Sequence, residues 1–134
     1  MTEDRSGAGD LAGRVTRALE HADFEAMRDL LDPDARWGHH DDPDGGCRNR
    51  DEVLAWYGER SRSGVSARVT EVVAHGDYLL VGLAVTGTWA ALEADGEARR
   101  WQVMSVDNGK IVDIRGFDDR AEAAARIGLP TEPA

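Results

Sequence analysis

Apolar residues in the first third of the chain recur at helical spacing. Side chains three or four positions apart form one apolar face at Leu11, Val15, Ala18, Leu19 and Ala22. This spacing predicts a helix over residues 11–22, with Asp10 as its N-cap, because a carboxylate can accept hydrogen bonds from free backbone N–H groups. A second helix is expected over 24–31, capped by Asp23 and ended by Pro33, which cannot donate to the helix ladder.

The pattern then changes to a short strand, a loop and a third helix. Residues 35–40 are expected to form a strand, and the Asp-, Pro- and Gly-rich segment 41–46 a loop. Asn49 followed three positions later by Glu52 resembles a capping box, which predicts that a helix over about 50–62 begins there.

The second half of the chain has the pattern of a sheet. Apolar runs separated by Gly- and Asp-containing turns predict strands over 65–74, 78–92, 99–106 and 110–117. A short closing helix is expected over 120–127, with Asp118 or Asp119 as its cap. Helices grouped before a mainly antiparallel sheet indicate an α+β fold, in which the sheet can curl around the helices and leave a cavity.

Composition narrows the class of protein. The 134 residues suggest one domain, expected over 10–129 between a flexible N-terminus (1–9) and a tail (130–134). The net charge of −10 excludes a nucleic-acid binder, and no run approaches the roughly 20 apolar residues of a membrane span. Cys47 is the single cysteine, which excludes a disulfide scaffold and fits a reducing compartment. We expect a cytoplasmic bacterial protein.

Several stretches resemble the SnoaL-like branch of the nuclear transport factor 2-like superfamily. They lie, in the order and spacing of that family, at residues 23–27, 31–37, 47–53, 102–106, 108–112 and 117–120. The resemblance implies a cone, in which a curved sheet wraps over helices and leaves a pocket open at one end. Members include ketosteroid isomerases, scytalone dehydratases, polyketide cyclases and limonene-epoxide hydrolases, beside non-enzymatic binding domains.

The resemblance also assigns positions residue by residue. It places His39 at the carboxylate base of ketosteroid isomerases and Gln102 at their oxyanion donor. Val15 stands where those enzymes have a first-helix tyrosine. Gly116 stands where SnoaL-like cyclases have an acid/base aspartate late in the last strand.

These residues suggest an acid/base site. A neutral imidazole is a plausible general base, so His39 is the candidate base and Asp41 the group that orients it. Gln102 can donate and accept hydrogen bonds, and it is expected to stabilise charge that develops on a substrate oxygen. The structural alternatives are that His39 is a hydrogen-bonded strand histidine and that Gln102 is a buried amide satisfied by the backbone.

The expected substrate-binding residues are mostly apolar. Those proposed to line a pocket for a ring-bearing ligand are Trp37, Trp56, Tyr57, Trp89, Met104 and Ile114. Arg50 is a candidate contact for a carboxylate or phosphate at the mouth. The His, Asp and Cys residues between 39 and 47 lack regular metal-ligand spacing, so no metal is expected, and no Gly-rich phosphate motif implies an organic cofactor. Cys47 near a helix start is a weak candidate nucleophile.

The leading hypothesis is an isomerase, dehydratase, cyclase or hydrolase acting on a small hydrophobic organic molecule, with specialised metabolism as a compatible setting. The alternative is a non-catalytic ligand-binding or accessory protein on the same fold. A purely structural module, with Trp37 and Trp56 filling the pocket, is a third option. Alternation places Trp101 on the outer face of its strand, which favours a homodimer because large exposed aromatic side chains often mark contacts.

Overall fold

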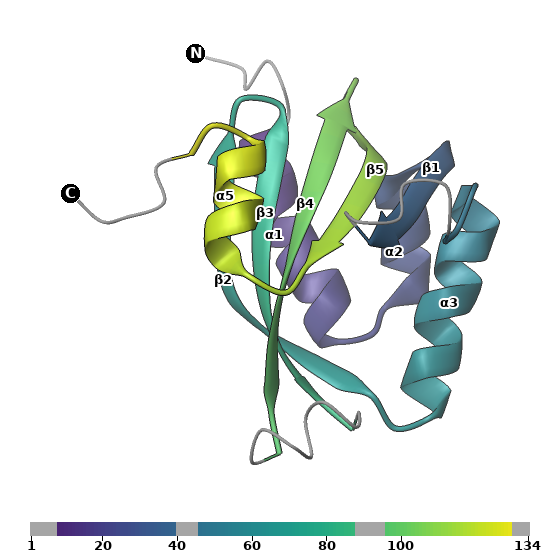
Figure 1. Cartoon of the computed structure of the whole chain (residues 1–134). Coiled ribbons are helices and arrows are strands. Elements are labelled where there is room, and N and C mark those ends of the chain that lie inside the picture. The colour runs from purple at the N-terminus through teal and green to yellow at the C-terminus, as the bar shows by residue number, and fades with distance from the viewer. Residues whose placement is uncertain (1–7, 40–45, 88–95, 130–134) are drawn as a thin grey trace.

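The fold is a five-stranded sheet with helices on both faces (Figure 1). The structure, a computed structural model, describes residues 8–39, 46–87 and 96–129. Its elements in chain order are α1 (Ala8–Glu20), α2 (Phe24–Leu30), β1 (Leu31–His39), α3 (Arg50–Arg62), β2 (Ser66–His75), β3 (Tyr78–Thr86), β4 (Ala98–Asp107), β5 (Lys110–Phe117) and α5 (Arg120–Arg126). The predicted α+β class is confirmed.

The sheet has the strand order β1-β5-β4-β3-β2. The last four strands form the predicted antiparallel meander, and β1 pairs in parallel with β5. The first strand of the chain thus lies beside the last, at the edge opposite β2. This arrangement brings residues from the end of β1 next to residues from the end of β5 and the middle of β4.

The two faces of the sheet pack against different helices. The main core lies between the inner face and α1, α2 and α3, with buried side chains such as Leu11, Met27 and Val53. A smaller cluster, which includes Leu80, Val103 and Ala123, lies under α5 on the outer face. Figure 1 shows α5 in front of the sheet and α1 behind it.

The second helix ends differently from the prediction. Asp23 caps α2 as expected, with its Oδ1 accepting from the Ala26 N–H at 3.1 Å. The helix ends at Leu30, and Leu31 already begins β1, so Pro33 lies inside the strand. A proline is tolerated there because β1 is an edge strand and its register shifts between Leu31 and Arg36.

Other predicted boundaries also differ. The first helix begins at Ala8, so Asp10 lies within it and is not its N-cap. Asp119 occupies the N-cap position of α5, but its side chain makes no capping hydrogen bond. The strand expected over 78–92 ends at Thr86, where Gly87 adopts a φ of +86°, and its remaining part lies outside the described residues.

The capping box predicted for α3 is present in a modified form. Oδ1 of Asn49 accepts from the Glu52 N–H at 2.9 Å, as expected. The Glu52 carboxylate reaches back to the N–H of Arg48, one residue before the cap, at 2.8 Å. Two otherwise free backbone donors are thereby satisfied, and the start of α3 is defined.

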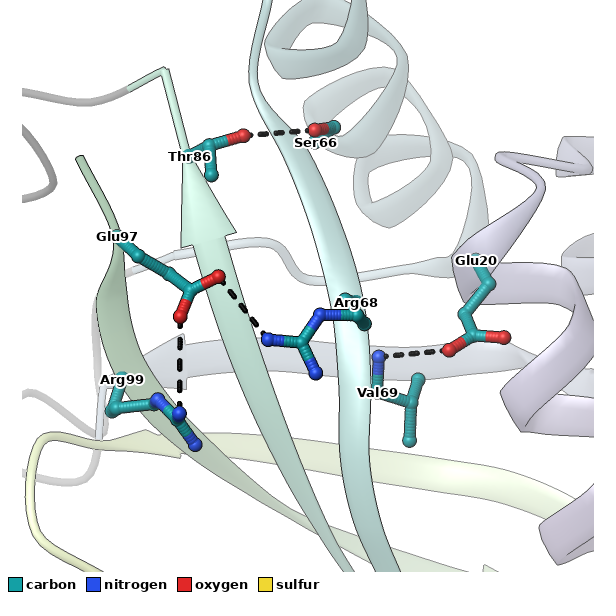
Figure 2. A network of polar contacts seen from close by, with 7 residues as sticks. All are labelled: Glu20, Ser66, Arg68, Val69, Thr86, Glu97 and Arg99. Carbon is teal, nitrogen blue, oxygen red and sulfur yellow. Dashed lines mark hydrogen bonds and ion pairs between the residues drawn. The ribbon is translucent and has the colours of Figure 1, made fainter.

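A polar network ties the edge strand β2 to its neighbours (Figure 2). The carboxylate of Glu20, at the end of α1, accepts from the Val69 N–H at 3.1 Å, beside a register shift in β2. Glu97 lies 3.2 Å from the guanidinium of Arg68 and 3.8 Å from that of Arg99. The contact from Glu20 satisfies an exposed backbone donor of the edge strand and holds β2 against α1.

The outer face of β4 is covered by the same chain. Trp101 lies on this face, as expected, and packs against the cluster under α5. Glu71 of β2 accepts two hydrogen bonds from the guanidinium of Arg120, at 2.7 and 3.0 Å, and so fastens α5 to the sheet. Trp101 is therefore not the exposed aromatic side chain that favoured a homodimer, and the homodimer stays a prediction.

Within the described parts of the chain, no helix is long and apolar enough to cross a membrane.

Candidate functional site

A cavity of about 340 Å³ opens between the helices and the inner face of the sheet. Its walls come from α1, α2, α3 and all five strands. Most of the wall is apolar, with side chains such as Phe24, Met27, Leu83 and Val85. The volume lies at the lower end of the roughly 300–1,000 Å³ typical of small-molecule pockets. Trp37 and Trp56 line the cavity without filling it, which disfavours the purely structural module.

Three strands place His39 and Gln102 on the same side of the sheet. His39 of β1 pairs with Gly116 of β5, and Gly116 pairs with Gln102 of β4. Residues directly opposite each other project to the same face, and all three line the cavity. Gly116 adds no side chain between the imidazole and the amide, and the ring of Trp37 lies beside it. An added Cβ at Gly116 would have room, since its nearest neighbour would be Trp37 Cζ2 at 3.8 Å.

Gln102 is the buried polar side chain of the inner face and contacts α3. The hydroxyl of Tyr57 donates to its Oε1 at 3.4 Å, a long hydrogen bond that joins α3 to β4. Burial raises the pKa of Tyr57 to about 12, and its contacts with Gln102 and Trp37 oppose that rise. The hydroxyl therefore stays protonated and available as a donor at neutral pH.

Aromatic side chains form one wall of the cavity. Trp37 lies 4.2 Å from Trp56 between ring centroids, and Trp56 lies 5.1 Å from Tyr57 in an edge-on arrangement. The buried Nε1 of Trp37 lies near the Tyr57 hydroxyl but makes no hydrogen bond within the described structure. Gly46 allows this placement: its φ is +91°, and a Cβ there would come within 2.1 Å of the Trp37 carbonyl oxygen.

The other polar part of the site is a group of charges around His39. Nε2 of His39 lies 3.8 Å from Oδ2 of Asp118, and Nε of Arg100 lies 3.4 Å from Oδ1 of the same carboxylate. These side chains are 40%, 67% and 41% exposed, respectively, so they stand toward solvent rather than in the apolar interior. The Asp118 carboxylate thus lies between the imidazole of His39 and the guanidinium of Arg100.

The structure brings only some of the predicted site residues together. The cavity walls include His39, Gln102, Trp37, Trp56 and Tyr57. Met104 and Ile114 point to the same face but are fully buried in the core nearer the start of β5, so they do not line the cavity. Arg50 lies at the start of α3, away from the cavity, with its Nε buried. Asp41 and Trp89 lie outside the described residues.

Cys47 and the metal hypothesis receive no support from the described residues. Cys47 is buried and forms a backbone bridge with Trp37. Burial and then the nearby Glu52 raise the pKa of its thiol, which disfavours the nucleophilic thiolate. Within 8–39, 46–87 and 96–129, no three His, Cys, Asp or Glu side chains gather as metal ligands.

Sequence reasoning missed three charged residues of the site. Asp118 was considered only as a helix cap, and Arg100 and Arg60 were not singled out. Arg60 could have been found from its spacing, because it follows Trp56 by four positions and Tyr57 by three on one helix face. No local signal places Asp118 beside His39, since that contact depends on the parallel pairing of β1 with β5.

Comparison with known proteins agrees with this architecture. The sequence profile of the SnoaL-like domain matches residues 12–114. A proposed ketosteroid isomerase from Kribbella flavida superposes with a TM-score of 0.70 at 20% identity, covering 90% of this chain and 83% of that one. IdmH, a proposed polyketide cyclase from Streptomyces antibioticus, has a TM-score of 0.63 at 22% identity, with coverages of 91% and 99%.

A third solved structure carries another activity on the same fold. An LEH-like epoxide hydrolase of M. tuberculosis has a TM-score of 0.62 at 16% identity, covering 94% of this chain and 92% of that one. No curated protein matches the chain by sequence. At these identities the solved structures establish the fold alone, and several chemistries share it. The profile match spans most of the chain, which therefore belongs to the SnoaL-like domain family.

Proposed function

We propose that this protein is a cofactor-independent acid/base enzyme that acts on a small, mainly apolar organic molecule. The observation that carries the proposal is the row His39–Gly116–Gln102, in which an imidazole and an amide line the same apolar cavity on the two strands that flank β5. Isomerases, dehydratases, cyclases and epoxide hydrolases all need a base and a group that stabilises charge on oxygen. The names of the solved relatives fall in these classes.

His39 is the proposed base. It would take a proton from a substrate carbon or from a water molecule, and the imidazolium that forms would be stabilised by Asp118 at 3.8 Å. Asp118 takes the orienting role expected of Asp41. Arg100 is its positioning partner, because its guanidinium lies 3.4 Å from the second carboxylate oxygen.

Tyr57 and Gln102 are the proposed partners of the substrate oxygen. The raised pKa of Tyr57 keeps its hydroxyl protonated, and its O–H would turn from Gln102 Oε1 to the substrate oxygen. The amide N–H of Gln102 would supply the second donor. Two strand spacings separate His39 from Gln102, or about 10 Å between their Cα atoms. The substrate would lie between them, with the proton leaving at one side and negative charge developing on an oxygen at the other.

Proton exchange tests this proposal without knowledge of the natural substrate. The probes are 2-tetralone, an enolisable aromatic ketone, followed by deuterium incorporation in D2O by NMR, and indene oxide, followed by diol formation. His39→Asn should lower the protein-catalysed rate about 100-fold or more. His75→Asn is the matched control, because His75 ends β2 at the far end from the cavity-lining Ser66 and Ala67. Equal rates for wild type and H39N on both probes contradict the proposal.

A non-catalytic binding protein is the second candidate. One observation favours it: Tyr57 and Gln102 satisfy each other, while His39 is 40% exposed. Such a protein would bind the probes in calorimetry with no deuterium incorporation and no diol formation.

A further inference from the structure

The charged side chains on the cavity wall differ in whether they contact a group of opposite charge or a hydrogen-bond partner. Besides His39, the formally charged lining residues are Glu20, Arg60, Arg100 and Asp118. Glu20 accepts from the Val69 N–H, and Asp118 pairs with Arg100. Arg60 has no carboxylate within 4 Å in the described parts of the chain. The chain carries a net charge of −10, so a lining arginine without a carboxylate needs an explanation.

The position of Arg60 is set by an aromatic contact. Its guanidinium carbon lies 4.8 Å from the ring centroid of Trp56, one helical turn earlier on α3. Such a cation–π contact engages the face of the indole ring and uses none of the N–H donors as hydrogen-bond donors to a carboxylate. The N–H donors project from its edge, and in that plane they can meet a carboxylate with two parallel hydrogen bonds. The contact with Trp56 therefore positions the guanidinium and leaves its N–H donors for a ligand.

Polar and apolar groups follow one another along α3 and its neighbours. At one end, the hydroxyl of Tyr57 meets Gln102. The rings of Trp37 and Trp56 come next, 4.2 Å apart between centroids and tilted by 31°. Arg60 follows, with its guanidinium carbon over the Trp56 ring. A ligand that matches this order has an oxygen at one end, a ring in the middle and an anionic group at the other end.

We propose that Arg60 binds the carboxylate of the substrate, which is an aromatic or alicyclic carboxylic acid with its ring against Trp37 and Trp56. This inference rests on the proposed function and deepens it by naming the substrate class. The binding step itself needs no catalysis. It moves the anion contact from Arg50, at the start of α3, to the last turn of the helix, about 15 Å further along the axis.

Calorimetry with two nearly isosteric probes tests the charge preference. The probes are 2-naphthoate and its neutral amide, 2-naphthamide. Wild type should bind 2-naphthoate about tenfold or more tightly than 2-naphthamide, as expected for hydrogen bonds to a charged group. Arg60→Gln should remove this preference, and Arg60→Lys should keep part of it because the charge remains. Arg62→Gln, on the exposed side of the same turn, should keep the full preference.

The outcomes separate this inference from the proposed activity. Equal affinity for the two probes in wild type, no binding of 2-naphthoate, or a preference that persists in R60Q would each overturn it. Proton exchange that depends on His39 but no preference for 2-naphthoate would refute the substrate class alone. A preference that depends on Arg60 but no exchange would refute the enzyme alone. Circular dichroism and thermal unfolding check whether R60Q is folded.

Discussion

The hydroxyl of Tyr57 lies 3.4 Å from the amide oxygen of Gln102 and joins α3 to β4 across the cavity. Sequence reasoning placed both residues in the site but assigned them separate roles, a ring for the ligand and a polar group for its oxygen. The structure joins them into one pair. The pair supplies a phenolic donor from α3, in a chain whose first helix has Val15 where the resemblance expects a tyrosine.

The buried hydroxyl of Tyr57 should lose its proton at a higher pH than an ordinary tyrosine. Tyr57 and Tyr78 are the only tyrosines of the chain. Burial raises the pKa of Tyr57 from 10.0 to about 12, so an absorbance titration near 295 nm should contain a step near pH 12. Tyr57→Phe should remove that step and Tyr78→Phe should keep it. A step near pH 12 in the Y57F variant would refute the assignment.

The same shift in pKa predicts how stability depends on alkaline pH. The folded pKa lies above the unfolded one, so the contribution of Tyr57 to the free energy of unfolding is complete below about pH 10. It should fall as the pH rises from about 10 to about 12. Urea unfolding across this range should show a smaller decline for Y57F than for wild type. Equal declines would mean that burial of Tyr57 does not disfavour its phenolate.

The absence of a side chain at Gly116 should keep room in the site beside Trp37. Gly116→Ala adds a Cβ whose nearest neighbour lies at 3.8 Å, so both fold and binding should be kept. Gly116→Leu extends a side chain into the space between His39 and Gln102 and should abolish binding of 2-naphthoate in calorimetry. Thermal unfolding of both variants checks folding. Binding by a folded G116L that matches wild type would show that the ligand lies elsewhere.

The pair between Glu71 and Arg120 should make the docking of α5 sensitive to acid. Hydrogen bonds from Arg120 lower the pKa of Glu71 below 4.5. The stabilisation is therefore present above that value and is lost as the pH falls through the lowered folded pKa. Because both side chains are about one third exposed, the pair contributes less than about 1 kcal/mol.

Thermal unfolding at pH 7 and pH 3 measures this effect. Glu71→Gln should lower the midpoint at pH 7 and reduce its change between the two pH values. Glu59→Gln is the control, because Glu59 is an exposed carboxylate on α3. If E71Q and wild type show the same change in midpoint between pH 7 and pH 3, the pair does not cause the acid sensitivity.

The cap at the start of α3 should be measurable in stability. Asn49→Ala removes the hydrogen bond from the Glu52 N–H and should cost about 1 kcal/mol in urea unfolding. Asn49→Asp keeps an acceptor at the same position and should cost less. If N49A unfolds at the same urea concentration as wild type, the cap does not stabilise α3.

Local chemistry was enough to predict most of the elements. The periodicities of 3.6 and 2, together with caps such as Asp23 and Asn49, correctly placed the helices and the antiparallel meander. Boundaries failed where tertiary pairing overrides a local signal. Pro33 reads as the end of a helix, but β5 pairs with the flanking residues and makes the segment an edge strand.

The sequence by itself indicated the family, the order of elements and the fact that His39 and Trp37 share one face of β1, because alternate residues of a strand project to the same side. It left open whether that face or the face of His40 turns toward the pocket. It did not determine which charged side chains contact one another in the site. The contacts of His39 with Asp118, and of Arg60 with the cavity, depend on how β1 pairs with β5 and on how α3 packs over the sheet. Contacts between residues far apart in the chain leave no local periodicity, so only the tertiary structure could select Asp118 and Arg100 for the site, whereas the spacing of Arg60 from Trp56 and Tyr57 is a local signal.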